Sequence, residues 1–116
     1  MPHRSRQFLR HGTLPQMAVF EAIVRLGSFT RAAQEMHMAQ PTVSGLMRKL
    51  TDTVGTPLFK RAGRNVVPTP AGRMLYATAG AVMDTLARAG AELAAMRAAS
   101  ALEAPARTPR ELAAHE

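Results

Sequence analysis

The sequence contains no cysteine. This absence excludes a disulfide framework and thiolate chemistry, and it suits a reducing compartment. No window approaches the ~20 consecutive apolar residues that a membrane-spanning helix needs. Residues 1–12 are basic, but they lack the apolar run of about 7–15 residues that defines a secretory signal peptide. We therefore expect a cytoplasmic protein that does not enter a membrane.

Signals for catalysis and for metal binding are also lacking. There is no glycine-rich phosphate loop. Ser28 and Ser44 have helix-cap and surface explanations, and no general base stands at a suggestive spacing from either. The histidines show no metal-ligand spacing, and they are His3, His11, His37 and His115. The sequence thus predicts neither an enzyme nor a protein with a metal or other cofactor.

Acidic residues are scarce in the first part of the chain. Residues 1–70 contain ten Lys and Arg but three Asp and Glu, whereas residues 71–116 contain five of each. The formal net charge of +7 therefore comes from the first part. A basic segment beside a neutral, alanine-rich one favours a polyanion-binding module joined to a segment that packs against protein. A solvated basic surface that maintains solubility is the alternative.

The segment that begins at Thr13 has the signals of a helix start. Thr13 can cap the helix, Gln16 completes a capping box, and Pro15 is tolerated in the first turn. Gly27 is expected to end this helix. Between these limits apolar residues recur at helical spacing, and they are Leu14, Met17, Phe20, Ile23 and Val24.

A second helix is predicted over about 29–36, with Ser28 as its N-cap. Pro41 cannot donate a backbone hydrogen bond and restricts Gln40, so the second helix must end before it. Because proline is favoured in the first position of a helix, a third helix is expected at about Pro41 to Thr53. Two helices joined by a short turn form a helix-turn-helix.

The predicted third helix has two unlike faces. Its apolar face is formed by Val43, Leu46, Met47 and Leu50. Its small, polar and basic face is formed by Thr42, Gly45, Arg48 and Lys49. The second helix of this motif therefore presents a surface suited to a polar, anionic partner.

Residues 56–68 contain short apolar runs on either side of a Gly-Arg-Asn turn. This pattern predicts a small β-hairpin with a basic tip, a wing. Thr69 can then cap a long helix that has Pro70 in its first position. We expect this helix to run to about Ser100, followed by an Ala/Pro-rich tail that is frayed or linker-like.

The long helix carries apolar and small residues at alternating spacings of four and three, which is an a/d seam. Its members are Leu75, Ala79, Val82, Leu86, Ala89, Leu93, Met96 and Ser100. The seam could cover the chain's own core, or the pattern could reflect alanine-rich helix propensity alone. A domain of about 70 residues has too little surface to cover about 45 Å of helix, so we favour a partner helix.

The order of elements resembles the DNA-binding domain of LysR-type transcriptional regulators, a mainly α winged helix-turn-helix with three helices and a β-hairpin wing, followed by a long linker helix. Matching residues occur in register over 14–100. They are Leu14, Phe20, the run 27–33, the run 40–44, Leu50, Gly55, the run 58–61, Arg64 and the run 69–72. The expected organisation is an extension at 1–12, the winged domain at 13–68, the linker helix at 69–100 and a tail at 101–116. We also expect this chain to lack the effector-binding domain that follows the linker helix in full-length members of the family.

The resemblance implies a homodimer that reads double-stranded DNA at an inverted repeat of the T-N11-A type, with half-sites about one helical turn apart. In the family, positions matching Gln40, Pro41, Thr42 and Ser44 are recurrent DNA contacts. The arginine that matches Arg64 enters the minor groove. The remaining expected DNA-contacting residues are Thr30, Arg31, Gly45, Arg48, Lys49 and Arg61. The antiparallel long helices would pair through the seam residues from Leu75 to Met96, and no small-molecule effector is expected to bind this chain.

Three residues depart from the family pattern. Ala39 replaces a serine that would cap the third helix, a loss of ~1 kcal/mol. Gly45 stands where relatives often carry a long base-reading side chain, and it lowers helix stability by ~0.5–1 kcal/mol relative to alanine. Thr51 replaces a glutamate. The first two departures favour an alternative function, an interaction module that pairs with a related regulator and antagonises it. A nonspecific chromosome-coating protein would also explain the charge.

Overall fold

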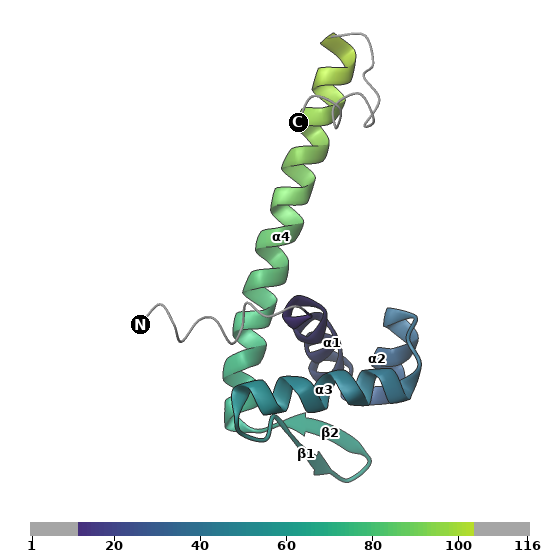
Figure 1. Cartoon of the computed structure of the whole chain (residues 1–116), viewed down its shortest axis with the longest axis vertical. Coiled ribbons are helices and arrows are strands. Elements are labelled where there is room, and N and C mark those ends of the chain that lie inside the picture. The colour runs from purple at the N-terminus through teal and green to yellow at the C-terminus, as the bar shows by residue number, and fades with distance from the viewer. Residues whose placement is uncertain (1–11, 104–116) are drawn as a thin grey trace. The chain divides into compact units, whose positions relative to one another are not determined.

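The computed structural model describes residues 12–103, which fold mainly as helices (Figure 1). The elements in chain order are α1 (Thr13–Leu26), α2 (Phe29–Met36), α3 (Gln40–Val54), β1 (Phe59–Ala62), β2 (Asn65–Pro68) and α4 (Pro70–Glu103). The predicted winged helix-turn-helix and long helix are thereby confirmed. The chain divides after Met83. The described residues 12–83 form the N-terminal unit and residues 84–103 the C-terminal unit.

Helix α1 begins differently from the prediction. Its N-cap is Gly12, at φ 94°, and no side chain forms a capping hydrogen bond. The Gln16 N–H donates to the Gly12 carbonyl at 3.0 Å, so Thr13 lies inside the helix, where it is buried. The expected Thr13–Gln16 capping box is therefore wrong, because glycine adopts the left-handed cap conformation without steric penalty. The end of α1 at Gly27, at φ 69°, is as predicted.

The helix-turn-helix follows the predicted boundaries closely. The Ser28 hydroxyl accepts a hydrogen bond from the Arg31 N–H at 3.1 Å, which confirms Ser28 as the N-cap of α2. His37, at φ 55°, ends α2. Helix α3 begins at Gln40, with Ala39 as an N-cap that offers no side-chain hydrogen bond. The helix that carries most of the expected base contacts thus begins without the usual side-chain cap.

The core of the N-terminal unit lies where α1, α2 and α3 pack against one another. Its largest fully buried side chains are Phe20, Ile23, Leu50, Leu58, Val19 and Val43. Burial of each such side chain stabilises the fold by about 1.5–3 kcal/mol. Leu46, predicted to face inward, is only half-buried, whereas Met47 is buried as expected.

The hairpin is fastened to this core by aromatic rings and a backbone bond. The Phe59 ring lies 5.3 Å from the Phe20 ring and 5.4 Å from the Phe29 ring, measured between centroids. Tilted and edge-on pairs at such separations are favourable. The Val66 N–H also donates to the Gly27 carbonyl at 3.2 Å. The wing is therefore held against α1 and the start of α2.

Strands β1 and β2 are antiparallel, and Ala62 pairs with Asn65. The turn between them is consequently Gly63-Arg64, with Gly63 at φ 64°. Asn65, expected in the turn, belongs to the strand instead. The tight turn places Arg64 at the tip of the wing.

Helix α4 starts as predicted and ends later than predicted. The Thr69 hydroxyl accepts from the Gly72 N–H at 3.1 Å and donates to the Pro57 carbonyl at 2.7 Å. The helix continues through Glu103, which corrects the expected end near Ser100. Alanine has the highest helix propensity, and no proline interrupts the sequence until Pro105. Of the expected tail, only residues up to 103 lie within the described chain.

Gly72 is required by close packing at the start of α4. A Cβ atom at this position would lie 2.2 Å from the Leu58 carbonyl oxygen. Only glycine therefore allows α4 to pack against the segment that leads into the wing.

Within residues 12–103, no helix is long and apolar enough to cross a membrane.

Candidate nucleic-acid interface

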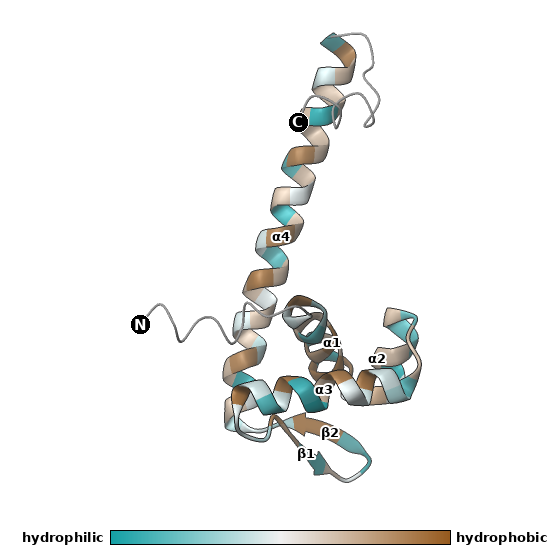
Figure 2. Ribbon diagram, in the orientation of Figure 1, coloured by the Kyte–Doolittle hydropathy of each residue, from teal (hydrophilic) through white to brown (hydrophobic). Residues whose placement is uncertain are grey.

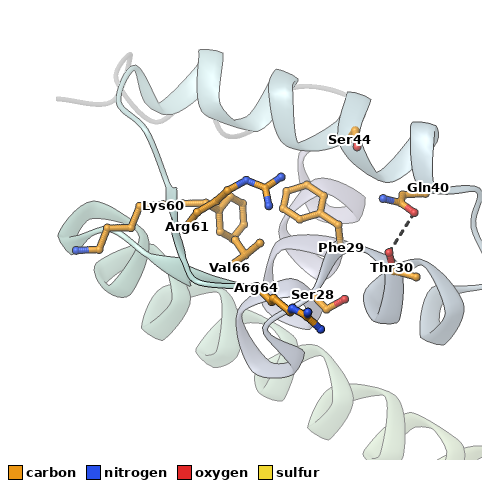
Figure 3. Close-up of a pocket in the computed structure, with 10 residues that line it drawn as sticks. Ser28, Phe29, Thr30, Gln40, Ser44, Lys60, Arg61, Arg64 and Val66 are labelled. Atoms are coloured by element: carbon orange, nitrogen blue, oxygen red, sulfur yellow. Dashed lines mark hydrogen bonds between the residues drawn. The ribbon is translucent and has the colours of Figure 1, made fainter.

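A pocket of about 490 Å³ opens between the start of α2, the start of α3 and the wing (Figure 3). It is lined by Ser28, Phe29, Thr30, Gln40, Ser44, Phe59, Lys60, Arg61, Arg64 and Val66. The structure thus brings together residues that are far apart in sequence. Five of the predicted DNA-contacting residues share this pocket, and they are Thr30, Gln40, Ser44, Arg61 and Arg64.

A hydrogen bond links the two helices of the helix-turn-helix at this pocket. The Thr30 hydroxyl donates to the Gln40 side-chain oxygen at 3.1 Å (Figure 3). The side-chain oxygen of glutamine has a second lone pair, and its NH₂ group has two donors. The bond therefore restrains the Gln40 amide and leaves it able both to donate and to accept. Sequence reasoning did not find this pairing, because the two residues belong to different helices.

The wing contributes a group of cations to the pocket. Arg61 and Lys60 are neighbours on β1, and successive side chains of a strand point to opposite faces. Figure 3 shows the Arg61 guanidinium turned toward α3, while the Lys60 side chain extends in the other direction. Lys60 also lines the pocket, but it is not among the residues that the sequence predicted to contact DNA. Its position next to Arg61 in the basic wing was the signal that could have identified it.

Two acidic side chains of the N-terminal unit form an ion-pair cluster with one arginine, away from the pocket. Arg25 binds Glu21, at 3.0 Å between Nε and Oε2, and it also binds Glu35. The hydrogen bonds that Arg25 donates to Glu35 lower the pKa of Glu35, and the bonds that it donates to Glu35 and Glu21 raise the pKa of Arg25. None of these residues lines the pocket. Two of the few acids in this unit are therefore paired with a cation elsewhere, and the pocket keeps its positive charge.

The other predicted contact residues lie outside the pocket, on exposed or half-exposed parts of α2 and α3. They are Arg31, Pro41, Thr42, Gly45, Arg48 and Lys49. Gly45 is half-exposed and the others are exposed. These residues extend the polar, basic surface along α3, so the candidate interface consists of the pocket and the adjoining face of this helix.

The residues of the expected seam have unequal burial. Ala79 is completely buried in the core of the N-terminal unit, and Leu75 and Val82 are half-buried against that core. The first part of the seam therefore packs against the chain's own core, which was the alternative to pairing with a partner helix. Ala79 is thus corrected from a partner contact to a core residue, because the start of α4 packs on its own domain.

The later seam residues are exposed. Leu86 is 50% exposed, Leu93 64% and Met96 66%, and Ala89 is exposed as well. Figure 2 shows strongly apolar residues recurring along α4 between polar ones. Their role in dimerisation is a proposal.

A second, apolar groove lies within the N-terminal unit between the starts of α1 and α4. Its volume is about 770 Å³. It is lined by Thr13, Leu14, Met17, Val54, Thr56, Ala71, Met74, Leu75, Thr78 and Val82. Two of its apolar side chains are well exposed, Leu14 at 49% and Met74 at 76%. This groove is an apolar surface distinct from the basic pocket.

The sequence matches the family model described as bacterial regulatory helix-turn-helix protein, lysR family, over residues 14–73. The RuBisCO operon transcriptional regulator of Allochromatium vinosum is 46% identical over 76 residues, which are 66% of this chain and 25% of that protein. The transcriptional activator CmpR of Synechocystis sp. is 48% identical over 65 residues, 56% of this chain and 21% of CmpR. The chain thus spans about a quarter of the length of these curated relatives.

Solved structures of DNA complexes share the fold. The BenM DNA-binding domain in its catB site 1 DNA complex superposes with a TM-score of 0.68 at 29% identity, covering 72% of this chain and 92% of that one. The CbnR DNA-binding domain in a DNA complex gives a TM-score of 0.64 at 26% identity, covering 72% of this chain and 95% of the other.

Proposed function

The chain belongs to the LysR family of bacterial helix-turn-helix transcriptional regulators, and from this premise we propose that it binds an inverted DNA repeat of the T-N11-A type as a homodimer. One observation carries the proposal. The basic pocket gathers Thr30, Gln40, Ser44, Arg61 and Arg64 from three elements onto one surface. Relatives of the same fold are known in complex with DNA. A cytoplasmic location beside the nucleoid is part of the proposal.

Helix α3 is the proposed recognition helix. Its N-terminal residues Gln40, Pro41, Thr42 and Ser44 would meet base edges in the major groove, as is general for helix-turn-helix proteins. Arg48 and Lys49 lie one turn or more further along α3 and are exposed, where they would contact phosphate. Thr30 and Arg31, at the start of α2, would anchor the DNA backbone, with Thr30 acting through its main-chain N–H because its hydroxyl already donates to Gln40. Base contacts and backbone contacts are thereby assigned to different parts of the surface.

Gln40 is the residue best prepared to read a base. A glutamine that reads adenine donates from its NH₂ group to N7 and accepts from the N6 amine. The Thr30 hydroxyl already donates to the Gln40 oxygen, which leaves the second lone pair of that oxygen for the base. We assign Thr30 the role of positioning the Gln40 amide for a purine.

The wing is proposed to follow the minor groove. Arg64 stands at the hairpin tip and is exposed. A narrow A·T-rich minor groove has an enhanced negative potential that attracts guanidinium groups. Arg61, on the face of β1 turned toward α3, would contact the intervening phosphates.

The homodimer is proposed to form through antiparallel α4 helices. With Leu86 at the centre of the seam, Met96 of one copy would lie beside Leu75 of the other. Half-buried Leu75 and Val82 belong to the apolar groove, so the groove extends the same surface. Exposed apolar surface of this kind marks an interaction site. The winged helix-turn-helix of each copy is then one DNA-reading unit, and two such units held in this way would bind half-sites about one helical turn apart.

Fluorescence anisotropy of the purified chain tests the proposal. One labelled duplex carries the inverted repeat that the chain selects from random DNA, and the other carries a scrambled version. At about 0.15 M salt we expect a preference of ~10³ or more for the repeat. The slope of log affinity against log salt should be about −0.9 for each neutralised phosphate. Equal, weak binding to both duplexes would reject sequence-specific recognition.

A second candidate function is favoured by α3 itself. Its N-cap residue Ala39 makes no side-chain hydrogen bond, and Gly45 lies inside the helix. Both residues lower the stability of the proposed recognition helix. A chain with impaired DNA reading could still pair through α4 with a related regulator and antagonise it. Sedimentation of the chain mixed with such a regulator would distinguish the two, since the second candidate requires the mixed dimer to be preferred over the homodimer.

A further inference from the structure

Gly45 is a glycine that the fold does not require. It lies inside α3, and its φ is not positive, unlike those of Gly12, Gly27 and Gly55. A Cβ atom built at this position would have no neighbour within 4 Å. Alanine would therefore fit without strain and without a clash. Gly72 is the opposite case, because a Cβ there would overlap the Leu58 carbonyl.

The same glycine weakens the helix that contains it. Glycine in a helix interior is destabilising relative to alanine because it loses more conformational freedom on folding. Helix α3 also begins without a side-chain cap at Ala39. A residue that weakens an element, and that packing does not demand, indicates a role toward a partner.

Gly45 lies at the centre of an exposed helix face. Residues three and four positions away are its neighbours on the surface, and these are Pro41 and Thr42 before it and Arg48 and Lys49 after it. All four are exposed. The face thus has small side chains toward its N-terminal end, cations toward its C-terminal end, and open volume between them.

We propose that Gly45 is a specificity-determining residue that reads DNA by the space it leaves, selecting a base with a C5 methyl group. This inference rests on the proposed insertion of α3 into the major groove. The Gly45 backbone groups lie inside the helix, where they are used by intrahelical hydrogen bonds. With no side chain, Gly45 cannot select a base through a polar contact. It can only admit a group that a side chain would exclude.

The chemistry of the major groove identifies that group. Thymine differs from the other bases by a C5 methyl group that projects into the groove and prefers apolar contact. The Gly45 Cα would form an apolar floor for this methyl group, and Thr42, three residues earlier on the same helix face, would offer its own methyl group beside it. A 5-methylcytosine presents the same methyl group in the same place. The site is therefore matched to a methylated pyrimidine at one position of each half-site.

Binding measurements that combine a substitution in the protein with a substitution in the DNA test this inference. The probe is a labelled duplex recovered by selection from random DNA with the wild-type chain, in which each half-site thymine is replaced in turn by deoxyuridine. At one position per half-site, removal of the methyl group should weaken wild-type binding about fourfold, the value of one buried methyl. Gly45→Ala should bind the thymine duplex more weakly and should lose the preference for thymine over deoxyuridine at that position. In the wild type, 5-methylcytosine there should bind more tightly than cytosine.

Gly90→Ala is the matched control. Gly90 is exposed on α4, and a Cβ there also meets nothing within 4 Å. Both alanine variants should raise the unfolding midpoint, by about 2–6 °C, so a loss of binding in Gly45→Ala cannot be a loss of folding. Gly90→Ala should keep the thymine preference. If Gly45→Ala keeps it as well, the role of Gly45 is overturned while DNA binding stands. If the wild-type chain selects no duplex, the proposed function fails together with this inference.

Discussion

The two units of the chain differ in where their apolar side chains are. In the N-terminal unit, residues such as Phe20, Ile23 and Leu50 are fully buried among α1, α2, α3 and the wing. In the C-terminal unit every residue from 84 to 103 is exposed, Leu86 and Leu93 included. An isolated helix of that length is marginal in water. The first unit can stabilise itself, whereas the second depends on what covers its apolar residues.

The first prediction breaks the packing of the N-terminal unit. Gly72→Ala places a methyl group against the Leu58 carbonyl oxygen, where a Cβ would lie at 2.2 Å. Overpacking of this kind should lower the free energy of unfolding by about 2–3 kcal/mol, and the thermal midpoint by about 10–20 °C. Thermal unfolding followed by circular dichroism measures both. Gly80→Ala in the same helix is the control, because a Cβ there has no neighbour within 4 Å. Equal midpoints for the two variants would contradict the close approach at Gly72.

The second prediction breaks the proposed function of the C-terminal unit. Leu86→Asp puts a charge at the centre of the seam, where an antiparallel pair would bring two copies of it together. The variant should be monomeric by sedimentation and should bind the inverted repeat at least about 100-fold more weakly, since the second half-site no longer binds as part of one molecule. Leu102→Asp lies off the seam at a residue that is 90% exposed, and it should remain dimeric. A dimeric Leu86→Asp would show that the seam is misplaced.

The third prediction concerns positioning within the reading unit. Thr30→Val keeps the shape of the side chain and removes the hydroxyl that donates to Gln40 at 3.1 Å. Affinity for the operator should fall about 3–10-fold, the value of one such hydrogen bond, and the variant should have no further effect in a Gln40→Ala background. Thr53→Val removes a hydroxyl that donates to the Lys49 carbonyl and should leave affinity unchanged. Additive losses for Thr30→Val and Gln40→Ala would show that the two residues act separately.

The smallest effect is expected at the ion-pair cluster. Arg25 lowers the pKa of Glu35, so the folded state binds a proton at this carboxylate less readily than the unfolded state does. The stabilisation is complete above the ordinary pKa of a glutamate, about 4.3, and is lost as the pH falls through the lower, folded value. Glu35→Gln should therefore be slightly less stable than wild type at neutral pH, and this difference should shrink under acid. A difference that grew toward low pH would contradict the assignment.

The order of elements could be predicted from the sequence because local signals decide it. Ser28 and Thr69 cap their helices as expected, and Pro41 lies in the first turn of α3. The predicted N-cap of α1 was wrong because glycine and threonine are both favoured at this position. Only the backbone conformation shows that Gly12, not Thr13, is the cap. The end of α4 was placed early because no local signal stops an alanine-rich helix at Ser100.

Contacts between elements were less accessible. The Thr30–Gln40 hydrogen bond requires knowledge of how α2 and α3 pack, which no spacing in the sequence supplies. Ala79 and Leu86 occupy equivalent positions of one repeat, yet the first is buried in its own unit and the second is 50% exposed. Periodicity identifies a helix face that will be covered, but it does not identify what covers it.

The central claim is that the N-terminal unit reads DNA and that the C-terminal unit pairs two copies of the chain. Its most direct test is how the affinity for DNA depends on the spacing between half-sites. Anisotropy would compare the selected inverted repeat with a duplex in which about 5 extra base pairs separate the same half-sites, which turns them to opposite faces of the DNA. If α4 holds two reading units at a fixed separation, the insertion should weaken binding at least about 100-fold. Equal affinity for the two duplexes would show that each reading unit binds alone, and it would contradict the dimeric account.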